Sequence, residues 1–115
     1  MSSVLLAPSV KPTPLPLIKK MIMPGEYHVS WAPAEITTLL GSCVAACLWD
    51  SHRKIGGMNH FMLPDSPNDA HTLADKTKSM RYGLYAMEVL VNDLLIMGAK
   101  REHLQAKVFG GANIT

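Results

Sequence analysis

Two apolar stretches flank a short polar segment near the middle of the sequence, and this arrangement predicts a β-hairpin. Residues 43–49 (CVAACLW) are apolar throughout, and residues 55–63 (IGGMNHFML) are largely so. The polar segment between them, DSHRK (50–54), is typical of a turn. Periodicity alone does not separate a short apolar strand from a helical turn. The turn followed by a second apolar stretch favours two antiparallel strands.

The hairpin brings a cysteine and a histidine together. If Ser51 and His52 form the turn, Cys43 lies opposite His60 on the neighbouring strand. Directly opposed residues share one face of a sheet, with their Cβ atoms about 5 Å apart. A register shift by two positions leaves the pair as diagonal neighbours. The sequence therefore predicts a contact between a thiol and an imidazole.

Such a pair suits nucleophilic catalysis, which needs a thiolate, a base and donors for an oxyanion. The turn at Gly41 and Ser42 leaves backbone N–H groups near the Cys43 sulfur. The remaining histidines have weaker geometric claims because they lie in the turn, before a proline or in loop-like surroundings: His28, His52, His71 and His103.

Two other interpretations stay open at this point. A cysteine in an apolar strand is usually a packing residue, and this applies to Cys43 and more strongly to Cys47. Zinc binding by Cys43, Cys47, His52 and His60 is the second alternative. Their spacing fits no standard zinc-ligand pattern, so we predict no metal.

The rest of the chain predicts one domain behind a proline-rich tail. Residues 1–24 contain several prolines and are expected to form the tail, and residues 25–115 the domain. Within the domain we expect strands at 26–31 and 35–40, an exposed loop at 64–79, a helix from Met80 to about Met97, and a strand starting near Ala106. The helix is predicted because five apolar residues recur at helical spacing: Leu84, Met87, Val91, Leu94 and Leu95.

Composition excludes several classes of function. The chain has 115 residues, the size of one ordinary domain, and 48% of them are apolar. The net charge of +2, without a basic run, gives no case for nucleic-acid binding. We find no secretory signal and no segment suited to membrane insertion. Two cysteines make no disulfide framework, so we expect a reducing cytoplasm.

The longest motifs resemble one family. TLLGSCVAACLWD followed by GGMNHFMLP, and later RYGLYAMEVLVNDLLIMGAKREHLQAKVFGGA, resemble the CheD family, the chemoreceptor glutamine deamidases of bacterial chemotaxis. The resemblance covers about residues 35–112. It implies an α/β (α+β) fold in which a β-sandwich-like sheet packs with helices.

The resemblance also implies a site and a reaction. The family hydrolyses glutamine side chains of methyl-accepting chemotaxis receptors to glutamate, without a cofactor, and some members also hydrolyse receptor methyl esters. Its nucleophile corresponds to Cys43, its base to His60 and its orienting threonine to Thr37 rather than Thr38. Gly41 and Ser42 would support the oxyanion. The implied partners are the cytoplasmic helices of receptors and a CheC-type phosphatase.

The family pattern breaks off after Ala112, whereas family members continue with further strands. We therefore expect a fold truncated at its C-terminus. This leaves a second hypothesis open, in which the chain is an inactive relative that serves as a binding module in chemotaxis. Intact Cys43, His60 and Thr37 favour the enzyme.

Overall fold

The computed structural model describes residues 16–62 and 73–112. Six strands, one α-helix and one short 3-10 helix make up this part of the chain. In order they are β1 (Ile18–Met21), β2 (Tyr27–Ser30), β3 (Ala34–Thr37), β4 (Val44–Asp50), β5 (Ile55–Asn59), α1 (Leu73–Met97), η1 (Arg101–His103) and β6 (Leu104–Gly110). Helix α1 is not apolar enough to count as a candidate membrane span, nor is any other helix in the described residues.

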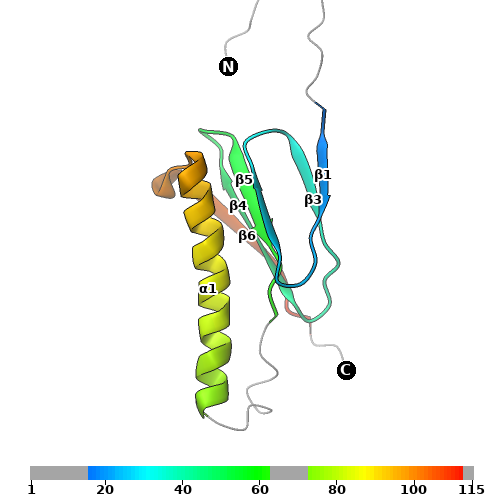
Figure 1. Cartoon of the computed structure of the whole chain (residues 1–115), viewed down its shortest axis with the longest axis vertical. Helices are drawn as coiled ribbons and strands as arrows, with labels where there is room; N and C mark the ends of the chain where they lie inside the picture. Colours follow the sequence, from blue (N-terminus) through cyan, green and yellow to red (C-terminus); the bar gives the residue numbers. More distant parts are fainter. Residues whose placement is uncertain (1–15, 63–72, 113–115) are drawn as a thin grey trace, which may run out of the picture.

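The elements form three layers (Figure 1). The central layer is a four-stranded antiparallel sheet in the order β2-β5-β4-β6. Helix α1 covers one face of this sheet, and the parallel pair β1-β3 lies on the other side. The predicted α+β class, with a sandwich-like arrangement of sheets and a helix, is confirmed.

Strand β4 supplies side chains to both sides of the central sheet, since successive residues point to opposite faces. Leu48 packs toward the helix with Leu90 and Leu94, whose exposed fraction is zero. Ala45 packs toward the β1-β3 pair with Ile22 and Met58. Fully burying one such leucine contributes about 1.5–3 kcal/mol. The central sheet is therefore apolar on both faces, which explains why residues 43–49 show no alternation of polar and apolar residues.

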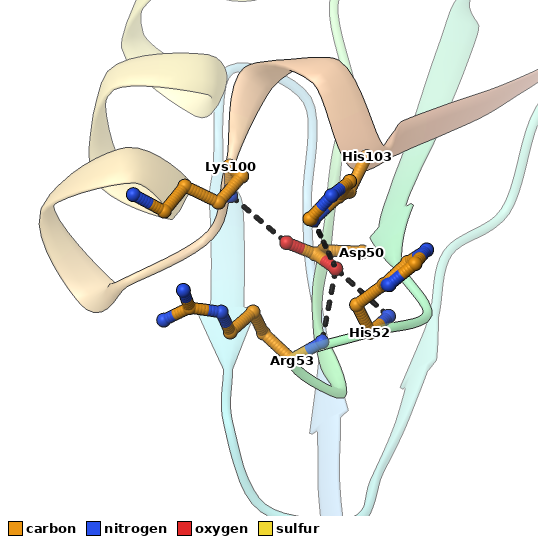
Figure 2. A network of polar contacts seen from close by, with 5 residues as sticks. All are labelled: Asp50, His52, Arg53, Lys100 and His103. Carbon is orange, nitrogen blue, oxygen red and sulfur yellow. Dashed lines mark hydrogen bonds and ion pairs between the residues drawn. The ribbon is translucent and has the colours of Figure 1, made fainter.

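A buried carboxylate fixes the turn between β4 and β5 (Figure 2). Asp50 is fully buried, and its Oδ1 accepts the backbone N–H groups of His52 and Arg53, each at 2.9 Å. Its Oδ2 accepts the N–H of Lys100 at 2.8 Å, which ties the turn to the segment after α1. The His103 imidazole lies 3.8 Å from Oδ1 and stacks on the His52 ring.

The turn is longer than predicted. It spans residues 51–54 and ends at Lys54, whose φ of 59° is left-handed. Trp49 therefore pairs with Gly56 rather than with Lys54, and the predicted register is wrong by two positions. The physical reason is the Asp50 carboxylate, which binds two N–H groups of the turn and stabilises the wider loop.

The remaining elements largely agree with the strands and the helix predicted from the sequence. The strands expected at 26–31, 35–40, 43–49 and 55–63 and near Ala106 are confirmed as β2 to β6, with shifted ends. The expected tail is wrong over its last residues, because β1 pairs with β3 and Ile22 is buried. The expected loop at 64–79 is wrong from Leu73 onward, where α1 begins. Residues 1–15 lie outside the described part.

Candidate functional site

Thr38 and His60 form the best-defined polar pair of the predicted site. Thr38 follows β3, His60 follows β5, and the hydroxyl Oγ1 lies 2.6 Å from Nδ1 of the imidazole. The same hydroxyl donates its only proton to the carbonyl of Ile22, at 2.7 Å. It must therefore accept from Nδ1, which carries the ring proton. In the neutral imidazole, this leaves Nε2 as the unprotonated, basic nitrogen.

His60 is held firmly. Its side chain is 2% exposed, its backbone N–H donates to Glu26 at 3.0 Å, and its carbonyl accepts from Gly25 at 2.8 Å. Its Nε2 is buried and has no hydrogen-bond partner among residues 16–62 and 73–112. A buried nitrogen without a partner is unfavourable and rare in folded proteins. A bound molecule that carries a proton donor would satisfy this nitrogen.

Cys43 lies directly before β4 and is a half-buried, free thiol. The pairs Val44–Phe61 and Cys47–Met58 share one register, so Ala45 lies opposite His60 and Cys43 opposite Met62. Cys43 is thus a diagonal neighbour of His60, not its direct partner as predicted. Diagonal neighbours in a regular sheet lie about 7–8 Å apart. Catalytic hydrogen bonds are often long before substrate binds, so this placement is compatible with a Cys–His pair.

Gly110 in β6 restricts the backbone at Cys43. The Cys43 carbonyl accepts the N–H of Gly111 at 2.8 Å, and Gly110 has a φ of 103°. A Cβ atom at Gly110 would collide with the Cys43 carbonyl. Strand β6 therefore needs glycine here to hold the cysteine turn in its present position.

The threonine prediction is wrong as to which residue contacts the histidine. Thr37 is the last residue of β3, pairs with Met21 and is exposed. Side chains alternate along a strand, so Thr37 shares a face with exposed Glu35, whereas Thr38 follows half-buried Ile36 inward. The inward-facing Ile36 is the signal in the sequence that points to Thr38.

The predicted oxyanion turn lies beside the cysteine. Gly41 is half-buried, Ser42 is exposed, and both belong to a bend that leads into β4. Among the described residues, the N–H groups of Ser42 and Cys43 donate to no backbone carbonyl. The N–H of Val44 is already bound to Phe61. Two backbone donors are therefore available next to the sulfur.

Asn59 connects the site to the rest of the fold. Its Oδ1 accepts the N–H of Ala46 at 2.9 Å, and its Nδ2 donates to the Ala86 carbonyl at 3.3 Å. These bonds join β5 to β4 and to α1 immediately beside His60. The neighbouring base is thereby fixed relative to both elements.

The four residues of the zinc alternative do not gather at one place. His52 lies in the β4-β5 turn, at the opposite end of the hairpin from His60. Within residues 16–62 and 73–112, no three His, Cys, Asp or Glu side chains are placed to hold a metal ion. Burial raises the pKa of the Cys47 thiol, and nearby Lys107 opposes this only in part. Cys47 packs against the cluster of Ile22, Ala45 and Met58, as expected for a cysteine in an apolar strand.

Comparisons with known proteins point to one family. A family profile described as CheD chemotactic sensory transduction matches residues 62–115. A protein of Thiobacillus denitrificans, named probable chemoreceptor glutamine deamidase CheD, is 59% identical over 93 residues, which are 81% of this chain and 45% of that protein. Proteins of the same name from Herminiimonas arsenicoxydans and Janthinobacterium sp. are 58% and 56% identical, with the same shares covered. The resemblance to the CheD family is thus confirmed, for a chain that spans less than half the length of these curated relatives.

Proposed function

We propose that this chain carries the catalytic residues of a cysteine-dependent deamidase that converts glutamine side chains of chemoreceptors to glutamate. The relatives named probable chemoreceptor glutamine deamidase support the reaction and the substrate class. The observation that carries the assignment of residues is the hydrogen bond between Thr38 and Nδ1 of His60. It leaves a basic, unpartnered Nε2 on the strand that neighbours Cys43.

The proposed reaction has two halves. His60 takes the thiol proton, and the Cys43 thiolate attacks the Cδ carbonyl of the glutamine. The imidazolium then gives the proton to the departing nitrogen, so that ammonia leaves and a thioester remains. Water attacks the thioester while His60 takes one of its protons. The thiolate leaves, and the product is glutamate.

Thr38 and the cysteine turn have supporting roles in this proposal. Thr38 orients the imidazole without bringing a charge, because its hydroxyl accepts from Nδ1 while bound to Ile22. The free N–H groups of Ser42 and Cys43 would bind the oxyanion of each tetrahedral intermediate. Losing one such donor costs about 3 kcal/mol of transition-state stabilisation in well-studied hydrolases.

The proposal also predicts the compartment in which the reaction takes place, its regulation and a second substrate. A free thiol at Cys43 must stay reduced, which fits the cytoplasm, where the receptor helices would be met. Regulation by a CheC-type phosphatase and hydrolysis of methyl esters follow only from the family resemblance. Mass spectrometry of receptor fragments can test both.

Mass spectrometry of receptor cytoplasmic fragments tests the proposed reaction. Incubation with the protein should convert specific glutamines to glutamates, each with a mass gain of about one dalton, whereas Cys43→Ala should give none. Cys47→Ala is the matched control and should keep the activity. Stable binding of the fragments without any mass gain in the wild-type protein would favour the binding-module hypothesis instead.

A further inference from the structure

A small cavity lies where the edge strand β2 meets the middle of α1. Its volume is about 250 Å³. Sites for drug-sized ligands usually measure roughly 300–1,000 Å³, so this cavity suits one side chain or a molecule of that size. Three tyrosines belong to its wall, which includes Glu26, Tyr27, Asn59, His60, Tyr82 and Tyr85. We call it the tyrosine cavity.

The tyrosine cavity lies on the α1 side of the central sheet, because side chains alternate between the two faces along a strand. Tyr27 pairs with Asn59 in β5 and reaches Asp93 of α1, so these side chains point toward the helix. His60, the next residue after Asn59, points to the opposite face, where its imidazole contacts Thr38. The cavity is therefore a separate site that adjoins the His60 backbone, and the inference below does not depend on the proposed function.

The tyrosines offer aromatic surface that a ligand can reach. The exposed fractions are 39% for Tyr27, 41% for Tyr82 and 65% for Tyr85. Gly25, with a φ of 87°, brings the β1-β2 loop close to the Tyr82 hydroxyl, which would lie 3.8 Å from a Cβ atom at this position. Aromatic faces carry partial negative charge and attract cations.

The charged groups at the cavity are carboxylates. Glu26 lines it, and no lysine or arginine stands among the described residues that do. The Glu26 Oε1 accepts the N–H of Met23 at 2.8 Å, which holds this carboxylate in place. Asp93 accepts the Tyr27 hydroxyl at 2.5 Å, and this bond, with burial and the charges of Asp93 and Tyr85, raises the pKa of Tyr27. Such a wall favours a positively charged ligand.

We propose that the tyrosine cavity binds the guanidinium group of an arginine side chain. A guanidinium is planar, stacks on aromatic faces and is more weakly hydrated than the ammonium group of lysine. Its N–H groups can donate to the Glu26 carboxylate while its plane lies against a tyrosine ring. A neutral ligand of the same shape would lack the attraction to Glu26 and Asp93.

Titration of the ¹⁵N-labelled protein with Nα-acetyl-arginine amide, followed by NMR, tests the proposed site. Backbone peaks should shift at Gly25, Glu26 and Tyr85, with a dissociation constant on the order of 1 mM, as expected for one side chain. Nα-acetyl-citrulline amide has the same shape without the charge and should bind at least about fivefold more weakly. Free arginine is the second arm, and the tighter of the two arginine probes shows whether the site takes arginine in a polypeptide or the free amino acid.

Two variants and two matched controls locate the binding. Tyr85→Ser and Glu26→Gln should each weaken binding roughly twofold to fivefold, and the glutamine can still accept the N–H of Met23. Leu84→Ser removes the neighbouring side chain on α1, which is 63% exposed and does not line the cavity. Glu35→Gln removes an exposed carboxylate of β3, on the other side of the central sheet. Both controls should leave binding unchanged.

The inference is overturned if the arginine probes shift no peaks at the cavity, or if the citrulline probe binds as tightly as they do. It is also overturned if either control variant weakens binding as much as the variant it matches. Tyr85 and Glu26 are exposed, so both variants should keep the wild-type dispersion of peaks. If Tyr85→Ser does not fold, Glu26→Gln decides alone, and unchanged binding in that variant contradicts the site.

Discussion

The Thr38 hydroxyl joins the His60 imidazole to the edge of the β1-β3 pair, accepting from Nδ1 at 2.6 Å while donating to the Ile22 carbonyl at 2.7 Å. One side chain therefore decides both where the ring lies and which of its nitrogens is basic. The neighbouring Thr37 makes no such contact and is exposed. This difference between adjacent threonines makes the role of Thr38 testable.

Thr38→Val should lower kcat for deamidation by roughly tenfold to a hundredfold, because the imidazole can then turn or carry its proton on the wrong nitrogen. KM should change little, since Thr38 is not expected to contact substrate. Thr38→Ser keeps the hydroxyl and should restore most of the rate. Thr37→Val is the matched control. Equal losses for both valine variants would show that Thr38 has no positioning role.

Gly110→Ala should impair both stability and activity. The new Cβ would collide with the Cys43 carbonyl, and a φ of 103° is strained for alanine by about 1–3 kcal/mol. Gly98→Ala carries similar strain at a φ of 119°, but its Cβ would meet only Ile55, at an ordinary 3.5 Å. Urea unfolding should therefore show a loss for both variants, and the folded Gly110→Ala protein alone should lose deamidation. Normal activity in Gly110→Ala would contradict the coupling of β6 to the cysteine turn.

Asp50 should make stability depend on pH in the acidic range. Burial of the carboxyl raises its pKa, but the N–H groups of Lys100, Arg53 and His52, with His103 nearby, outweigh this and hold the pKa below its ordinary value. A lowered folded-state pKa gives stability that is complete above the unfolded value of about 3.9 and is lost as the pH falls through the folded value.

Urea unfolding of wild type and Asp50→Asn at pH 7 and at several lower pH values checks this expectation. At pH 7 the variant should be the less stable protein, because its amide group would face the Lys100 N–H, a second donor. The difference should shrink as the pH falls below about 4, where the wild-type carboxylate takes up its proton. A constant difference across this range would contradict the linkage.

Local patterns in the sequence predicted the elements of the fold better than their boundaries. The apolar stretches around the turn identified β4 and β5, because both faces of their sheet are covered and apolar residues are needed throughout. The exact turn was not predicted, because the Asp50 carboxylate binds the N–H groups of His52 and Arg53 in a wider loop and also binds the N–H of Lys100, which is fifty positions away. Similarly, β1 is held by pairing with β3, which its own exposed residues IKKM do not indicate.

The site was predictable in its elements but not in its geometry. The hairpin and the family resemblance predicted that Cys43 and His60 are neighbours, and the structure places them directly before β4 and directly after β5, which pair with each other. The threonine was misassigned because a one-residue step along a strand reverses the direction of the side chain. Ile36 indicates Thr38 by alternation along the strand, but this signal can be used only once the structure shows that Ile36 faces inward.

The central claim is that His60, oriented by Thr38, takes the proton of the Cys43 thiol, and alkylation by iodoacetamide tests it without any substrate. A free cysteine is only a few per cent thiolate at pH 7, so an effective base can raise the labelling rate on the order of tenfold. Peptide mapping should show that Cys43 reacts about tenfold faster in wild type than in His60→Gln, while the slower Cys47 is labelled equally in both. Equal labelling of Cys43 in the two proteins would contradict the claim.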